Sequence, residues 1–139
     1  MDIVILIGRI VFVSLFLSSA KGHLTKSKMM AGYTKSKGVP FPQFAVLASG
    51  VLLLVGALSI LFGVWADIGA LFLVAFLVPT ALLMHPYWKE TDPGAKAGDR
   101  AHFLKDISLA GASLMLFAFF AFAGTSLGLT LTGSAFSLH

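Results

Sequence analysis

The sequence has no cysteine and very little charge. Only 12% of its 139 residues are charged and 58% are hydrophobic, whereas a soluble domain is about 25% charged and about 45–50% apolar. The lack of cysteine excludes disulfides, thiolate zinc and iron–sulfur sites, and a cysteine nucleophile. The composition excludes a soluble globular domain and predicts a membrane protein.

Acidic residues are scarce as well, with six Asp and Glu against ten Lys and Arg and a net charge of +4. Nine of the ten basic residues lie in two stretches, 21–43 and 89–105. In a chain this apolar, such a bias reports membrane topology, because Lys and Arg concentrate in cytoplasmic loops. We therefore expect no nucleic-acid partner, both basic stretches in the cytoplasm, and both termini outside.

Long apolar runs fill most of the chain. An apolar helix needs about 20 residues to cross a hydrocarbon core of about 30 Å. The sequence predicts one membrane domain over 1–139, an all-α transmembrane four-helix bundle in the cell (cytoplasmic) membrane. Its expected spans are about 3–21, 44–64, 68–84 and 104–124, with loops at about 22–43 and 85–103 and an outer tail at about 125–139.

The first loop carries two copies of the pattern Thr-Lys-Ser-Lys around Met29, Met30 and Tyr33. As a short interfacial helix between the first and second spans, it would place Lys heads on anionic lipid while Met and Tyr dip into the membrane. An ordinary solvated loop is the alternative. The basic residues expected to face lipid are Lys26, Lys28, Lys35 and Lys37.

Arg9 is the one basic residue inside an apolar run, and an intramembrane arginine suggests a function. Three interpretations stay open. Arg9 pairs with Asp67 in the outer turn, it holds an anionic headgroup or a quinone carbonyl, or it snorkels to the outer surface.

A second polar cluster is expected at the cytoplasmic side, where His23 ends the first span, His85 ends the third, and His102 and Asp106 open the fourth. His102 and Asp106 are four residues apart and share a helix face. Histidine titrates near neutrality, so a proton-handling or quinone-headgroup site at His85, His102 and Asp106 is one hypothesis. Capping is the other, with Asp99 as a candidate N-cap. We expect no metal site.

Glycine and proline bear on packing within the spans. Gly56-Ala57 and Gly69-Ala70 let neighbouring backbones approach closely. Pro79 removes a backbone hydrogen bond from the third span and is expected to kink that helix. The kink would either only shape the bundle or open a pocket in it.

The pattern resembles the DoxX family of small four-helix membrane proteins, from about Gly8 to Leu116. Gly8-Arg9-Ile10 resembles the family's opening helix. The stretch from Gly32-Tyr33 to Lys37-Gly38-Val39-Pro40 resembles its first loop, and His85-Pro86-Tyr87-Trp88 with His102-Phe103-Leu104-Lys105-Asp106 resembles its third-to-fourth helix junction. A glutamate often follows the Ser-Gly pair of the second helix in the family, whereas Val51 follows Ser49-Gly50 here.

The resemblance implies roles in quinone-linked redox systems or in the maturation of exported proteins. We expect an accessory or anchoring subunit of a redox-linked membrane complex that is not catalytic on its own, with quinone as the one candidate cofactor. Its partners would be membrane lipids and other subunits or further copies of the chain. The alternative is a quinone-binding oxidoreductase subunit, and a small oligomeric transporter is the third hypothesis.

Overall fold

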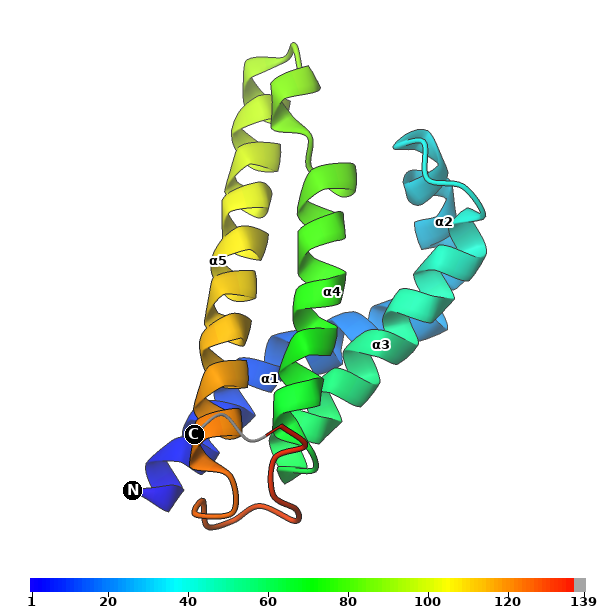
Figure 1. The fold of residues 1–139 in the computed structure, drawn as a ribbon. Coiled ribbons are helices and arrows are strands. Elements are labelled where there is room, and N and C mark those ends of the chain that lie inside the picture. The colour runs from blue at the N-terminus through cyan, green and yellow to red at the C-terminus, as the bar shows by residue number, and fades with distance from the viewer. Residues whose placement is uncertain (137–139) are drawn as a thin grey trace.

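A computed structural model describes residues 1–136 as helices joined by short connections (Figure 1). The elements are α1 (Asp2–Thr25), α2 (Ser27–Ser36), α3 (Pro42–Phe62), α4 (Ala66–Met84), the 3-10 helix η1 (Tyr87–Lys89) and α5 (Pro93–Ala123). Within this described part, α1, α3, α4 and α5 are long and apolar enough to cross a membrane. The predicted all-α fold, with four long helices and a short helix after the first, is confirmed. Residues 137–139 of the predicted tail lie outside the described part.

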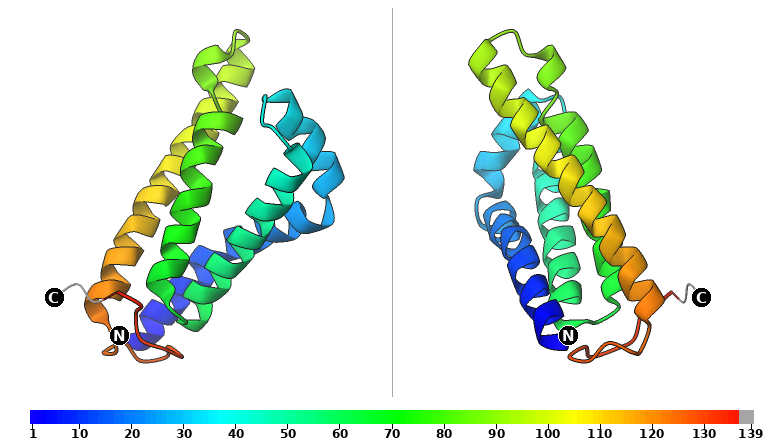
Figure 2. Two further views of the ribbon diagram at one scale, coloured as in Figure 1. Left: turned by 45° about the vertical axis from the view of Figure 1, so that its right-hand side comes forward. Right: turned by 90° about the vertical axis from the view of Figure 1, so that its left-hand side faces the viewer.

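The long helices alternate in direction, so the bundle has two distinct ends. α1 packs on α3, α3 on α4, and α4 on α5. We call the end with α2, η1 and the first turns of α5 the basic end. The start of α1, the α3–α4 turn and residues 124–136 form the tail end (Figures 1 and 2).

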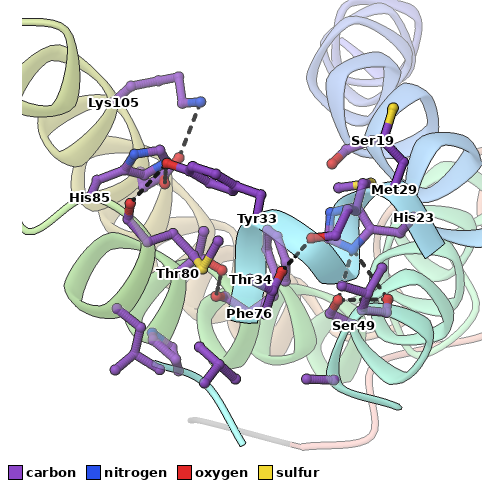
Figure 3. Close-up of a pocket in the computed structure, with 18 residues that line it drawn as sticks. Ser19, His23, Met29, Tyr33, Thr34, Ser49, Phe76, Thr80, His85 and Lys105 are labelled. Carbon is purple, nitrogen blue, oxygen red and sulfur yellow. Dashed lines mark hydrogen bonds and ion pairs between the residues drawn. The ribbon is translucent and has the colours of Figure 1, made fainter. Parts of the chain in front are cut away.

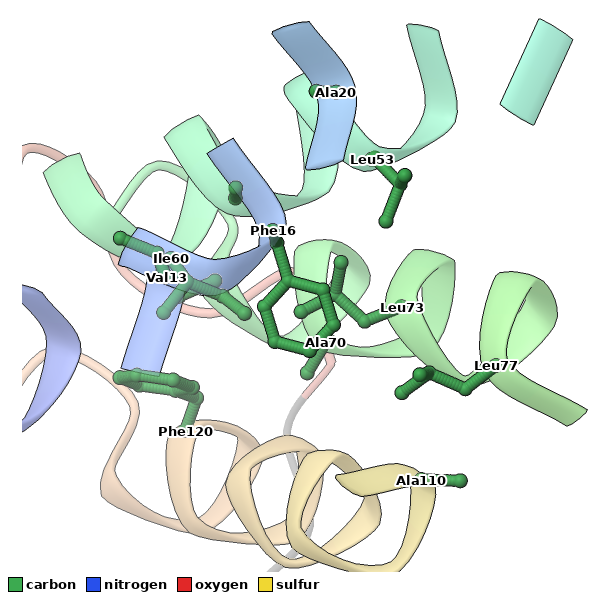
Figure 4. Close-up of a cluster of buried hydrophobic side chains, with 12 residues drawn as sticks. Val13, Phe16, Ala20, Leu53, Ile60, Ala70, Leu73, Leu77, Ala110 and Phe120 are labelled. Atoms are coloured by element: carbon green, nitrogen blue, oxygen red, sulfur yellow. The ribbon is translucent and has the colours of Figure 1, made fainter. Parts of the chain in front are cut away.

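The hydrophobic core fills the bundle between these ends. Phe16 of α1, Leu53 and Ile60 of α3, and Leu73 of α4 are almost fully buried (Figure 4). Phe120 of α5 is the buried residue that packs against this core at its tail-end side. Toward the basic end the α4–α5 pair diverges from α1, α2 and α3 (Figures 1 and 2).

Local sequence explains where the helices begin and end. α3 starts with Pro42 and stops at Gly63, whose φ of 64° is a left-handed conformation that glycine adopts without strain. α5 starts at Pro93, well before the expected span, because the side chain of Asp92 accepts a hydrogen bond from the backbone N–H of Ala95 at 2.8 Å. The prediction that Asp99 is the N-cap is therefore wrong.

Residues 124–136 fold back across the tail end. The backbone N–H groups of Leu131 and Thr132 donate to the carbonyl oxygens of Phe62 and Gly63 at 3.1 and 3.0 Å. The N–H of Trp65 donates to the hydroxyl of Thr132 at 2.9 Å. These bonds use backbone groups at the α3–α4 turn that the helices themselves leave unpaired, and they fix this tail segment against the bundle.

Candidate functional site: a pocket at the basic end

A cavity of about 480 Å³ opens where the two halves of the bundle diverge. Apolar groups such as Met30, Phe76 and Leu83 make up much of its lining. His23 and Ser49 lie on one side, His85 and Lys105 on the other, and Tyr33 of α2 between them (Figure 3). A cavity of this size, mostly apolar with a few converging polar groups, is typical of a small-molecule site.

The first polar wall is a histidine–serine pair. Nδ1 of His23 lies 2.7 Å from the hydroxyl oxygen of Ser49 and 3.2 Å from the carbonyl oxygen of Val46. A carbonyl only accepts hydrogen bonds, so Nδ1 carries a proton and Nε2 of the neutral ring is an acceptor. Gly50 permits this arrangement, because a Cβ there would lie 2.8 Å from Cβ of His23.

The second polar wall joins the end of α4 to α5. Nε2 of His85 lies 3.8 Å from Asp106 Oδ2, and Nζ of Lys105 lies 3.3 Å from Asp106 Oδ1. Asp106 is only 4% exposed. A buried carboxylate needs partners of this kind, because its desolvation costs several kcal/mol.

Helix α2 and the residues after it reach across to the α4–α5 half. The hydroxyl of Tyr33 donates to the carbonyl oxygen of Met84 at 3.5 Å. Nζ of Lys37 lies 3.3 Å from Asp99 and 3.5 Å from Glu90, and we call these three residues the Lys37 clasp. Burial disfavours the charge of Lys37, but the hydrogen bond to Asp99 and the nearby Tyr33 outweigh it and raise the pKa of Lys37.

Of the residues expected to cluster at this end, the structure places His23, His85 and Asp106 in the pocket lining and leaves His102 outside it. His102 stacks on His85 with ring centroids 5.0 Å apart but is itself exposed and outside the lining. Pro79 lines the cavity beside Thr80, whose hydroxyl donates to the Phe76 carbonyl at 2.7 Å.

One set of residues in and next to helix α2 lines the pocket, and another is exposed on the surface. Met29, Met30 and Tyr33 line the cavity. The basic residues Lys26, Lys28 and Lys35 are exposed, while Lys37 belongs to the clasp. Contact of the exposed lysines with lipid stays a prediction.

Arg9 lies at the opposite end of the bundle, far along α1 from the pocket. It is 3% exposed, and Nη2 donates to the carbonyl oxygen of Leu129 at 2.6 Å. Its Nε and Nη1 have no hydrogen-bond partner in the described part of the chain. The segment that covers Arg9 is thus the folded-back tail.

The expected ion pair between Arg9 and Asp67 is absent from residues 1–136. Asp67 is fully buried and instead accepts hydrogen bonds from the backbone N–H groups of Ala135 and Phe136 at 3.0 and 2.7 Å. The tail supplies a partner for each residue separately, an acceptor for the arginine and two donors for the carboxylate. The sequence predicts an outer tail but assigns it no partner, so neither contact was expected.

His23 was expected in the polar cluster but not among the proposed quinone-site residues, and Ser49 was expected in neither. A histidine at the end of an apolar helix and a Ser-Gly pair inside another were both visible. Their meeting depends on how closely α1 and α3 approach at Gly50, a tertiary contact that no single-helix pattern reports.

The four long apolar helices define a four-helix integral membrane protein, with a cavity at one end of the bundle. The DoxX family model matches residues 4–86, and the chain belongs to the DoxX family. The chain is 28% identical over 114 residues to the inner membrane protein YphA of Escherichia coli, covering 82% of this chain and 81% of that protein. It is 30% identical over 118 residues to the inner membrane protein YqjF of the same organism, covering 83% and 82%. No solved structure matches this chain.

Proposed function

We propose that this protein binds a membrane quinone in the basic-end pocket and serves as a subunit of a redox-linked complex in the inner (cytoplasmic) membrane. The observation that carries the proposal is the 480 Å³ cavity with polar side chains on two facing walls. A quinone head is a flat ring with oxygens at opposite edges, and its chain is apolar. Such a ring would place one oxygen toward the hydroxyl of Ser49 and the other toward His85 and Asp106.

The membrane assignment and the accessory role have separate support. Two similar proteins are named inner membrane proteins, which supports the same membrane here. Electrons would reach or leave the quinone through a partner subunit, because a cofactor rather than side chains carries such chemistry. The chain itself would bind and orient the ring.

The test is purification from native membranes in mild detergent, followed by mass spectrometry of co-eluting quinones and proteins. Ser49→Leu fills the polar wall on the α3 side, and Ser18→Leu is the matched control because Ser18 is exposed on α1. We expect quinone with the wild type and the control. Ser49→Leu should carry on the order of tenfold less, which corresponds to about 1.4 kcal/mol of lost binding.

Two results would contradict the proposal. Wild-type protein without quinone, or Ser49→Leu with as much quinone as Ser18→Leu, would exclude the pocket as the quinone site. The accessory role is tested in the same sample, since it requires a protein partner in stoichiometric amount.

A further inference from the structure

The imidazole of His85 lies between two carboxylates, one in the pocket lining and one outside it. Nδ1 faces Asp99 Oδ1 at 3.3 Å and Nε2 faces Asp106 Oδ2 at 3.8 Å. Asp106 lines the cavity, whereas Asp99 lies outside the lining, two turns nearer the start of α5. The ring therefore connects a carboxylate outside the pocket to one inside it, with one nitrogen directed to each.

The other charged and titratable groups around His85 do not contact the two carboxylate oxygens that face its ring nitrogens. Lys105 approaches the Oδ1 atom of Asp106, so Oδ2 is the oxygen that faces the ring. Lys37 approaches Asp99 through Oδ2, so Oδ1 faces the ring. Glu90 is held by Lys37, Tyr33 is directed to the Met84 carbonyl, and His102 stacks on the flat face of His85.

The hydrogen-bonding needs of a quinone and its quinol differ at Asp106. A quinone oxygen only accepts hydrogen bonds, whereas a quinol hydroxyl also donates. An ionised carboxylate only accepts. Lys105 lies at Oδ1, so on the Oδ2 side Asp106 can donate to a quinone oxygen only when its carboxyl carries a proton, whereas a quinol hydroxyl can donate to the ionised carboxylate. This side of the wall therefore matches the quinol when Asp106 is ionised and the quinone when Asp106 is protonated.

We propose that Asp99, His85 and Asp106 form a proton path from water at the basic end to the pocket, and that binding of a quinone draws one proton along it. This inference rests on the proposed function. The step requires the neutral His85 ring with its proton on Nε2. Once a proton from water has bound Asp99, that carboxyl donates it to Nδ1, Nε2 gives its own proton to Asp106 Oδ2, and the protonated Asp106 donates to the quinone oxygen. No electrons move, and a small side-chain rotation closes the 3.8 Å gap.

The test mixes purified protein in lipid nanodiscs with a para-benzoquinone bearing a short alkyl tail, in weakly buffered solution with a pH-indicator dye. No reductant is present. Stopped-flow absorbance then reports proton uptake, and a separate titration reports binding. We expect about one proton per bound quinone, the one needed to turn the acceptor-only carboxylate into a donor, and no uptake with the corresponding quinol.

Variants separate the amount of proton uptake from its rate. Asp106→Asn should bind the quinone with no uptake, because its amide N–H already donates. His85→Gln should reach the wild-type amount, since the final site is intact, but on the order of a hundredfold more slowly, a typical contribution of a positioned acid–base group. Arg100→Gln is the control, exposed next to Asp99, and should match the wild type in both.

The outcomes distinguish this inference from the proposed function. Absence of quinone and quinol binding in the wild type would overturn the proposed function, and the proton path with it. Binding without proton uptake, undiminished uptake in Asp106→Asn, or a wild-type rate in His85→Gln would overturn the path alone.

Discussion

Gly56 of α3 and Gly69 of α4 lie so close that a Cβ built on either would come within 3.0 Å of the carbonyl oxygen of the other. A Cβ on Gly69 would also lie 2.6 Å from Cβ of Ser59. Small residues at helix contacts allow this approach in membranes, where packing and hydrogen bonds rather than hydrophobic transfer hold helices together. The contact lies near the tail end, which explains how α3 and α4 meet there and diverge toward the pocket.

Gly69→Ala is expected to destabilise the bundle by about 1–3 kcal/mol, the usual cost of overpacking a close contact. The clash is with backbone and with a short side chain, so neither can move away cheaply. Gly111→Ala is the control, because a Cβ there has nothing within 4 Å. Thermal unfolding in the same detergent should show a lower midpoint for Gly69→Ala only, and equal midpoints would contradict this packing.

Asp67→Ala is expected to release the tail from the α3–α4 turn. The substitution removes two hydrogen bonds to a charged acceptor, each worth about 1.5–3 kcal/mol, and leaves the N–H groups of Ala135 and Phe136 without it. Hydrogen–deuterium exchange should become faster at those two amides. Asp92→Ala, which removes a cap at the basic end, should leave their exchange unchanged; equal acceleration in both variants would contradict a specific tail contact.

Lys37→Gln is expected to loosen the basic end with little loss of stability, below about 1 kcal/mol, because the Lys37 clasp is a partly exposed ion-pair network. Spin labels at Lys35→Cys and Lys96→Cys in this cysteine-free chain should report a broader distance distribution. Lys28→Gln, an exposed lysine on α2, should not broaden it. The same broadening in both variants would count against the clasp.

The clasp also has an expected pH dependence. Since the pKa of Lys37 is raised by its partners, its stabilising contribution is complete below the ordinary lysine value and is lost as the pH rises through the raised value. The spin-label distances should therefore stay constant near neutrality and broaden only in alkaline solution. Broadening between neutral and mildly alkaline pH would point to another group.

The membrane orientation is testable with single cysteines at the two ends. Ser27→Cys lies at the start of α2 and Ser134→Cys in the tail. If basic loops face the cytoplasm, an impermeant maleimide added outside should label Ser134→Cys and spare Ser27→Cys until the cells are opened. The reverse pattern would place the pocket mouth outside.

Helix number and type could be predicted from the sequence because they depend on local quantities. Long apolar runs indicate the spans. The basic stretch from Lys26 to Lys37 suggested a short helix with a solvated loop as the alternative, and the structure has the helix. The predicted fourth helix began too late, at about residue 104, because the hydropathy of the polar residues after Pro93 is typical of a loop. Asp92 and Pro93 were the available signal, as a capping residue followed by proline at the first helical position.

The candidate site could be predicted only in part. His85 and Asp106 were identified because both lie at span ends on the same side. Arg9 was a second candidate for contact with a quinone carbonyl, and α1 is long enough to keep it at the opposite end of the bundle from this pocket. The partners of Arg9 and Asp67 are backbone groups of an uncharged tail. Nearly every residue has a backbone donor and acceptor, so the residue types in the tail do not indicate these contacts.

That tail has a consequence for how the protein is made. Arg9 enters the membrane with the first helix, whereas Leu129, which accepts its hydrogen bond, is synthesised after the last helix. Chains grow at about 5–20 residues per second. Leu129 is 120 residues after Arg9, so it is synthesised several seconds or more after the guanidinium. During that interval the guanidinium of the first helix lacks this hydrogen-bond acceptor, which favours a shallow position near the membrane surface. Translation thus sets an order of events in which the tail end is completed last.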